Sequence, residues 1–208
     1  MSFSNNLAVM NPVDSQFPPR PTALVQELLR PLILPGDLVI DATAGNGHDT
    51  VFLADCVGEA GKVLAFDVQE AAMVSARERV AAVGFAGRVG FFRESHSRMD
   101  SHAASGSVSV IMFNLGYLPG EGHDLTTETG ETVAALEIAA RLLQPGGILS
   151  IVCYPGHPAG AIEAAAVEAW MKTLTPVGWR AARFGAIGTL RPAPFLLVGR
   201  KTGDRLLA

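Results

Sequence analysis

Two aspartates and the glycine turn between them are the residues with the clearest chemical meaning. Asp41 ends an apolar run and precedes a turn that contains Gly45 and Gly47. Asp67 ends the next apolar run, 20 residues after Gly47. Glycine lets the backbone turn tightly and approach a ligand, and a doubly wound fold places a ribose-binding carboxylate at the position of Asp67. The spacing therefore predicts a site for a nucleoside-like ligand.

The glycine pattern distinguishes this site from a dinucleotide site. The dinucleotide fingerprint G-x-G-x-x-G has a third glycine beside the pyrophosphate, whereas Thr50 stands at that position and Asp41 precedes the turn. A carboxylate there would repel a pyrophosphate but attract the sulfonium and ammonium groups of S-adenosylmethionine. We therefore predict S-adenosylmethionine rather than NAD as the ligand. The alternative is a structural strand, turn and helix with acids at its ends.

A second group of polar and aromatic residues follows the fourth expected strand, in the segment 113–120. Ligands of open α/β sheets bind outside the carboxyl ends of the strands, so Asn114 should meet the predicted ligand there. Its amide oxygen could accept a hydrogen bond from an attacking amine and align that amine with the donor methyl. Tyr117 could stack on a flat base. A tight turn with a packed tyrosine is the alternative.

Three of the five histidines fit a polar site at the same sheet edge. His48 lies in the glycine turn, His96 follows the third expected strand, and His157 follows the fifth, whereas His102 is expected at the surface. His157 could orient the acceptor or take its proton, and a structural role in its loop fits equally well. The histidines and carboxylates form no compact set such as H-E-x-x-H, so no metal is predicted.

The elements that position these residues alternate as in an α/β fold with a mostly parallel seven-stranded sheet, helices on both faces and an antiparallel closing strand. Helical spacing predicts a first helix around Leu24–Leu29 that ends at Pro35-Gly36, and residues 95–107 show little periodicity. Strands are expected at 38–40, 62–67, 89–93, 108–114, 148–153, 177–184 and 195–200, and further helices at 48–57, 70–83, 128–143 and 159–173.

Length and composition favour one enzyme domain at residues 22–202, preceded by a flexible, proline-containing segment at 1–21. The chain has 208 residues, of which 49% are hydrophobic, enough for a large core. Cys56 and Cys153 are expected to be buried, reduced thiols. The start of the chain has no signal-like segment and no apolar run approaches about 20 residues, so we expect a soluble, cytoplasmic protein without a membrane contact.

The net charge of −4 argues against a broadly basic surface for nucleic acid but leaves room for a local patch. Arg183 and Arg191 flank the long segment before the last expected strand, and they are the basic residues best placed to contact phosphates. Arg77 and Arg79 are expected away from the ligand edge. A homodimer could combine two such patches.

Six segments of the chain, in order, resemble motifs of the rRNA methylase family of bacterial methyltransferases: residues 41–50, 65–70, 95–96, 113–120, 125–129 and 154–158. The resemblance covers most of residues 24–200. It implies a Rossmann-like class I methyltransferase fold with S-adenosylmethionine as donor. It also implies tRNA as partner, with N-methylation of the aminomethyl group of 5-aminomethyl-2-thiouridine at the wobble position.

The same resemblance implies roles for individual residues. Asn46 and Asp49 would line the methionine end of the donor, Asp67 and Gln69 the ribose, and Ser95 with His96 the adenine. The chain departs from relatives at residues 121–124, Glu-Gly-His-Asp, and at Pro155, where relatives carry a lysine and a second histidine. These departures concern the acceptor contacts, and two other functions stay open: methylation of a small-molecule or protein amine, and donor binding without catalysis.

Overall fold

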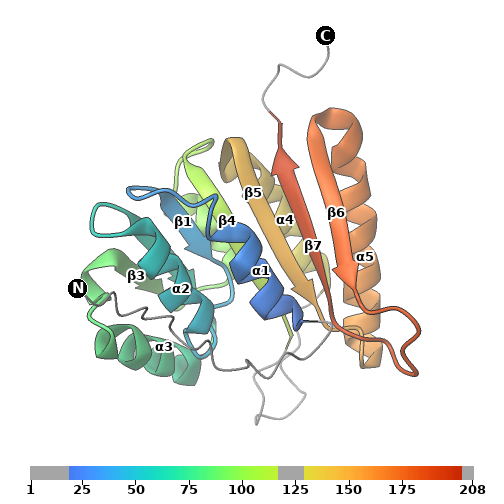
Figure 1. The fold of residues 1–208 in the computed structure, drawn as a ribbon, viewed down its shortest axis with the longest axis horizontal. Helices are drawn as coiled ribbons and strands as arrows, with labels where there is room; N and C mark the ends of the chain where they lie inside the picture. Colours follow the sequence, from blue (N-terminus) through green and yellow to red (C-terminus); the bar gives the residue numbers. More distant parts are fainter. Residues whose placement is uncertain (1–18, 117–128, 203–208) are drawn as a thin grey trace, which may run out of the picture.

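The structure is a computed structural model that describes residues 19–116 and 129–202 (Figure 1). Seven strands form one sheet in the order β3-β2-β1-β4-β5-β7-β6. The pairs β5·β7 and β6·β7 are antiparallel and the others are parallel, as the sequence predicted. The strands are β1 (Leu38–Asp41), β2 (Lys62–Phe66), β3 (Val89–Phe92), β4 (Val108–Leu115), β5 (Leu143–Cys153), β6 (Trp179–Gly185) and β7 (Phe195–Lys201).

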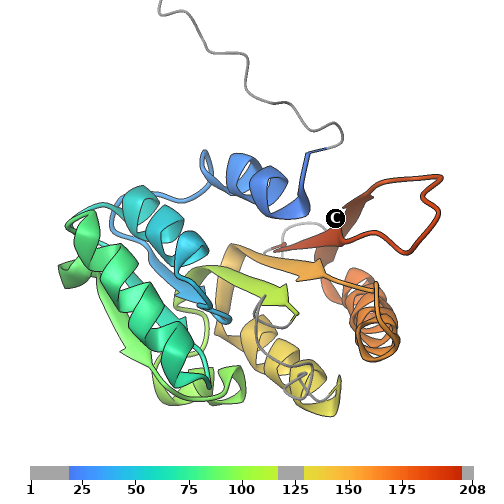
Figure 2. The same cartoon turned by 90° about the horizontal axis from the view of Figure 1, so that it is seen from below.

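Helices cover both faces of the sheet (Figure 2). The helices of the described residues are α1 (Pro21–Leu29), α2 (His48–Val57), α3 (Glu70–Ala82), α4 (Thr129–Leu142) and α5 (Pro158–Leu174), with short 3-10 helices η1 (Ala86–Arg88), η2 (His96–Ser101) and η3 (Thr175–Val177). None of these helices is long and apolar enough to cross a membrane.

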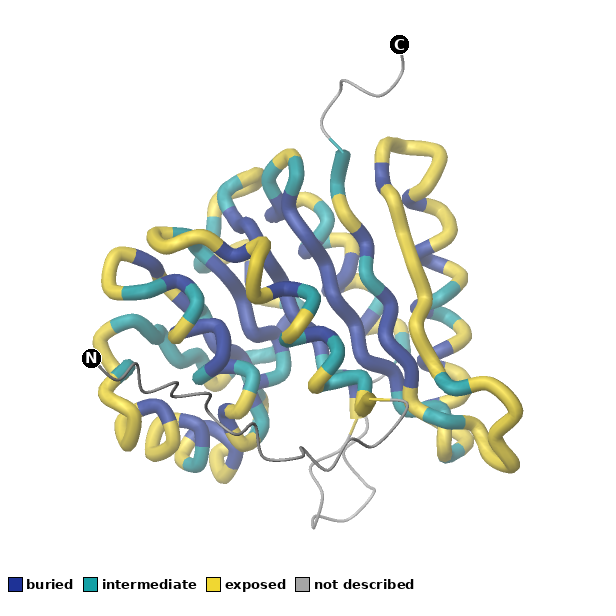
Figure 3. The backbone as a smooth tube through the Cα atoms, viewed as in Figure 1, coloured by how far each residue is buried: buried dark blue, intermediate teal, exposed yellow. Residues whose placement is uncertain are grey.

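Two hydrophobic clusters lie on opposite faces of the central strands because successive side chains of a strand point to opposite sides. Val39 and Val110 pack with α1 and α2 on one face, whereas Ile40 and Ile111 pack with α4 and α5 on the other. Burial on both faces is typical of parallel strands and explains their continuous apolar sequence. In Figure 3 the central strands are buried, while β6 is exposed along most of its length.

Three details differ from the sequence prediction. The helix α1 begins at Pro21 rather than after it, because the first helical position needs no N–H donor, and it ends at Leu29, before Pro35-Gly36. The strand β5 begins at Leu143 rather than at residue 148, because the Pro-Gly-Gly segment is a bulge within it, with Gly146 at a φ of 84°. Residues 1–18 lie outside the described chain, so the division into a flexible segment and one domain stays a prediction.

Candidate active site

The glycine turn leaves the carboxyl end of β1 and leads into α2. Gly45 and Gly47 have φ angles of 48° and 78°, in the left-handed region that favours glycine. A Cβ atom at Gly47 would lie 2.7 Å from the Cα of Ala76 in α3, whereas the nearest atom to a Cβ at Gly45 would be the Thr43 carbonyl at 3.9 Å. The structure thus gives Gly47 a packing role against α3 and leaves Gly45 as the glycine that faces open space.

Asp67 fastens the glycine turn to the end of β2. Its Oδ2 accepts the Gly45 N–H at 2.9 Å, and its Oδ1 accepts the Gln69 N–H at 3.0 Å. A carboxylate offers about four lone-pair positions, so both oxygens can accept further hydrogen bonds from a ligand. The Oε1 atom of Gln69 is buried and has no hydrogen-bond partner among the described residues. This edge of the sheet therefore presents acceptors for hydroxyl groups.

Asp41 is a buried carboxyl group, 1% exposed, at the end of β1. Its oxygens accept the Thr50 hydroxyl at 2.5 Å and the Thr43 N–H at 3.2 Å. Burial, and then the charge of Asp49, raises the pKa of Asp41 to about 7. Asp49 accepts a hydrogen bond from the Gln26 side chain at 2.7 Å, and burial raises its pKa too. A cationic ligand would stabilise this acidic pair in its charged form.

The high pKa of Asp41 predicts how the stability of the unliganded protein depends on pH. The folded state holds a proton that the unfolded state releases above pH 3.8, so stability decreases as the pH rises toward 7. Between the two pKa values the free energy of unfolding decreases by about 4 kcal/mol. We expect Asp41→Asn to remove this decrease and to be a few kcal/mol more stable than the unsubstituted protein at pH 8. Urea denaturation at pH 5 and pH 8 measures the free energy of unfolding of both proteins. An unchanged pH dependence in Asp41→Asn would contradict the raised pKa of Asp41.

The residues expected near the adenine come from η2 and are tied to α4. The Ser95 hydroxyl accepts the Ser97 N–H at 3.1 Å and caps η2, and both serine hydroxyls donate to Glu131. These bonds lower the pKa of Glu131. His96 is buried with its ring edge-on to Phe113, and burial lowers its pKa, which favours the neutral ring. Its Nε2 atom has no hydrogen-bond partner within residues 19–116 and 129–202.

Asn114 lies at the end of β4, next to the glycine turn. Its backbone N–H donates to the Thr43 hydroxyl at 2.7 Å. Its side chain forms a hydrogen bond with the Tyr154 hydroxyl, while burial and the charge of Asp49 raise the pKa of Tyr154. The Oδ1 atom of Asn114 is buried, and no described residue donates a hydrogen bond to it. Leaving a buried acceptor unsatisfied costs about 1–3 kcal/mol, so this oxygen is suited to an N–H group of a ligand.

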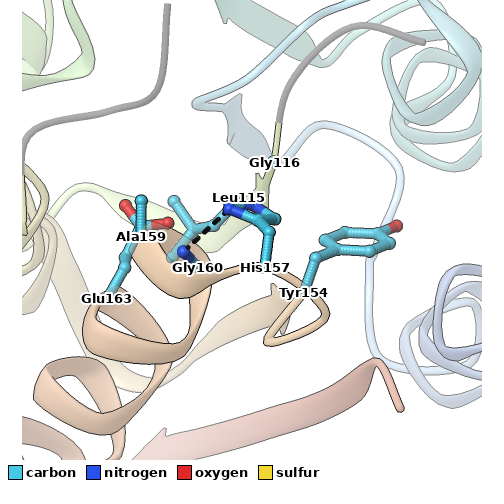
Figure 4. A pocket seen from close by; sticks show the side chains of 7 residues that line it. All are labelled: Leu115, Gly116, Tyr154, His157, Ala159, Gly160 and Glu163. Atoms are coloured by element: carbon cyan, nitrogen blue, oxygen red, sulfur yellow. Dashed lines mark hydrogen bonds between the residues drawn. The ribbon is translucent and has the colours of Figure 1, made fainter. Parts of the chain in front are cut away.

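A small pocket lies between the ends of β4 and β5 and the start of α5 (Figure 4). His157 caps α5 through its Nδ1 atom, which accepts the Gly160 N–H at 3.1 Å. Glu163, 7% exposed, accepts the Thr132 hydroxyl at 2.6 Å. The structural role of His157 is thus visible, and its ring also lines the pocket. The lining residues are Leu115, Gly116, Tyr154, His157, Ala159, Gly160 and Glu163.

The other expected residues differ in their exposure. Asn46 is exposed, and its side-chain oxygen accepts the Ser75 hydroxyl of α3 at 3.3 Å. His48 is also exposed. His102, expected at the surface, is half-buried there: its ring centroid lies 3.9 Å from that of Phe92, and its Nε2 lies 3.2 Å from Glu94. Cys153 is buried and Cys56 is only half-buried, both as free thiols. Tyr117, Glu121, His123 and Asp124 lie outside the described residues.

Several partners of the site were not predicted from the sequence. Gln26, Thr43 and Tyr154 each contact a candidate residue, although only Thr43 and Tyr154 lie within motifs recognisable in the sequence. Arg79 was expected away from the ligand edge, but its Nε donates to the Asn46 carbonyl at 2.6 Å. The described part of the chain contains no group of three or more histidine, cysteine, aspartate or glutamate side chains arranged to hold a metal.

Comparisons with known proteins agree with this architecture. The family described as "Putative rRNA methylase" matches residues 63–200. The Arabidopsis thaliana protein named "tRNA (mnm(5)s(2)U34)-methyltransferase, chloroplastic" is 39% identical over 176 residues, which are 80% of this chain and 64% of that protein. The chain thus spans somewhat less than two thirds of the length of this curated relative.

Two solved structures that resemble this chain are also described as methylases or methyltransferases. A Clostridium thermocellum protein described as a "putative rRNA-methylase" is 33% identical with a TM-score of 0.84, and the match covers 88% of this chain and 98% of that chain. A "putative methyltransferase" from Streptococcus mutans, solved in complex with SAH, is 30% identical with a TM-score of 0.79 and the same coverage. The sheet order, the helices on both faces and these matches show that the chain has the Rossmann-like class I methyltransferase fold and belongs to the rRNA methylase family.

Proposed function

We propose that this protein is an S-adenosylmethionine-dependent methyltransferase that N-methylates the aminomethyl group of 5-aminomethyl-2-thiouridine at the tRNA wobble position. The observation that carries the proposal is the buried Asn114 Oδ1 atom, which lacks a donor among the described residues, next to an acidic ligand site. An acceptor amine has the N–H group that this oxygen lacks. The name of the Arabidopsis relative supports the choice of RNA as substrate.

The residues of the site fit S-adenosylmethionine. Gly45 leaves room for a ligand, Asp41 and Asp49 would face its cationic methionine end, and Asp67 with Gln69 would accept the ribose hydroxyls. Ser95 and His96 would lie on the adenine side, where the buried Nε2 of His96 offers an unused polar atom. When bound, S-adenosylmethionine supplies a methyl group that is already activated by the sulfonium.

The acceptor side needs orientation more than acid or base strength, because holding reacting atoms in line supplies much of the rate of such a transfer. Asn114 would accept one amine N–H and so fix the direction of the nitrogen lone pair. The hydroxyl of Tyr154 holds the Asn114 side chain, which restricts the position of its oxygen. In this proposal Tyr117 stacks on the uracil ring and His157 borders the acceptor, as expected from the sequence.

Nucleoside mass spectrometry tests the proposal directly. tRNA that carries the unmethylated aminomethyl-thiouridine is incubated with the protein and S-adenosylmethionine, and the modified nucleoside is then weighed. We expect it to gain one methyl group, about 14 Da, in a reaction that Asn114→Ala strongly slows. Absence of the gain in a protein that binds S-adenosylmethionine would mean that another amine is the substrate.

The RNA surface is proposed to include the segment between β6 and β7. Arg191 is exposed there, and the Pro192 carbonyl lies 3.9 Å from the position of a Cβ at Gly156, next to the pocket. Arg183 fits a phosphate contact less well than expected, because it forms an ion pair with Glu168 at 3.4 Å and lies over the Phe195 ring.

Arg191→Ala is therefore expected to weaken tRNA binding and to reduce the salt dependence of the binding constant by about one unit of logarithmic slope, as for one lost phosphate contact. Arg180→Ala, at the opposite end of β6, is the matched control and should leave the slope unchanged. Fluorescence anisotropy with labelled tRNA from 50 to 200 mM salt measures both. An unaltered slope in Arg191→Ala would place the RNA elsewhere.

A homodimer and a cytoplasmic location stay predictions, and the Arabidopsis relative is named as chloroplastic.

A further inference from the structure

Gln26 is a polar residue of α1 that reaches the donor site from outside every sequence motif. Its Nε2 donates to the Oδ1 atom of Asp49, in the first turn of α2, at 2.7 Å. Both side chains are half-buried. On the same helix Val25 and Leu29 are fully buried against the sheet, on the face that α2 also covers (Figure 1). The core therefore fixes the direction from which Gln26 approaches Asp49.

The charge of Asp49 lies where the donor and acceptor sides of the site meet. It acts on Asp41 at the end of β1 and on Tyr154, which directly follows β5. The Tyr154 hydroxyl in turn contacts the side chain of Asn114. A carboxylate near both groups fits the ammonium of the methionine end of the donor, because the neighbouring sulfonium methyl must face the acceptor.

An amide is well suited to hold this carboxylate, because it supports the charge of Asp49 without neutralising it. Burial raises the pKa of Asp49, and the Gln26 hydrogen bond, followed by the charge of His48, opposes this shift. A lysine or arginine in place of Gln26 would form an ion pair with Asp49 and compete with a cationic ligand. Gln26 thus fixes the carboxylate and leaves its negative charge available.

From this contact we propose that Gln26 is a positioning residue, which holds the Asp49 carboxylate toward the ammonium group of the donor. Ligand-binding side chains need such support from neighbouring hydrogen bonds to keep their orientation. The site would then prefer nucleosides that carry the amino-acid part of S-adenosylmethionine over nucleosides that lack it. This role rests on the donor placement of the proposed function but not on the identity of the acceptor amine.

The test measures the affinity for two nucleosides by calorimetry, so that it does not depend on turnover. S-adenosylhomocysteine carries the ammonium, whereas 5′-methylthioadenosine has the same adenine, ribose and thioether sulfur without the amino-acid part. We expect Gln26→Ala to bind S-adenosylhomocysteine about tenfold more weakly, as for one lost hydrogen bond to a charged group. Its affinity for 5′-methylthioadenosine should change by less than about twofold.

Gln26→Lys separates positioning from simple support of the helix. Lysine restores a donor to Asp49 but also pairs with its charge, so it should weaken S-adenosylhomocysteine binding and spare 5′-methylthioadenosine. Recovery of the full preference for S-adenosylhomocysteine in this variant would overturn the proposal, because any contact between the helices would then suffice.

Arg30→Ala is the matched control. Arg30 also joins α1 to α2, through an ion pair with Asp55 at 3.0 Å, but it does not contact Asp49. Both affinities should stay unchanged in this variant. An unaltered preference in Gln26→Ala, or an equal loss for both nucleosides, would overturn the role of Gln26. Methylation of tRNA is measured separately, so a failure of the proposed function is recognised independently of these affinities.

Discussion

Asp67→Ala is expected to lower the affinity for S-adenosylmethionine by about 150- to 25,000-fold. Two ribose hydroxyls would lose charge-assisted hydrogen bonds, each of which contributes about 1.5–3 kcal/mol. The substitution also removes the acceptor of the Gly45 and Gln69 N–H groups, so the glycine turn would be less well held before the ligand arrives. Isothermal titration calorimetry of the folded variant measures the loss.

Two further variants separate ribose binding from support of the turn. Asp67→Asn keeps one acceptor oxygen and the size of the side chain, and it should lose an intermediate amount of affinity. Asp37→Ala removes a carboxylate that accepts the Leu34 N–H at 2.9 Å before β1, at the opposite edge of the sheet, and should not change donor affinity. An unchanged affinity in Asp67→Ala, or an equal loss in Asp37→Ala, would refute the ribose role.

The architecture could be predicted from sequence because each strand and most helices carry their own local signal. Apolar runs such as 38–40 and 63–66 predict buried parallel strands, and the repeated strand and helix order then restricts the topology. The errors came from residues whose effect depends on context. Pro21 begins a helix instead of preventing one, and the Pro-Gly-Gly segment bends β5 rather than preceding it.

The site was less predictable, because its partners come from distant parts of the chain. Asp41 and Asp67 stand at strand ends that local patterns reveal. The contact of Gln26 with Asp49 joins two helices, and that of Thr132 with Glu163 joins two others across 31 residues, so neither has a local signal. Burial changes the chemistry as well, since the raised pKa of Asp41 depends on the surrounding core rather than on its neighbours in sequence.

The acidic pair, Asp41 and Asp49, also favours binding of the donor at the expense of the stability of the unliganded fold. Burial disfavours ionisation of both Asp41 and Asp49, and the charge of Asp49 disfavours that of Asp41 further, so the two groups destabilise the folded chain as the pH rises. A positively charged ligand stabilises the ionised carboxylates, and this stabilisation contributes to the binding free energy of the ligand. Neutral S-adenosylhomocysteine keeps the ammonium but lacks the sulfonium charge, so the same pair should favour the donor over the product.

Asn114→Ala is expected to lower the turnover number by about 100-fold while changing donor affinity by less than about threefold. The loss follows from the misalignment of the amine, which costs this much in comparable cases. The backbone N–H of residue 114 still reaches the Thr43 hydroxyl in the variant, so β4 and the glycine turn keep their positions. Single-turnover methylation and calorimetry, measured on the same preparation, separate the two effects.

Tyr154→Phe provides the second arm of this experiment. It removes the hydroxyl that contacts the Asn114 side chain but keeps the ring that packs on Gly116. Turnover should decrease several-fold, and the double variant should be no slower than Asn114→Ala alone, because Tyr154 would act only through Asn114. Additive losses would mean that Tyr154 contacts the acceptor itself, and normal turnover in Asn114→Ala would show that the unsatisfied oxygen does not hold the amine.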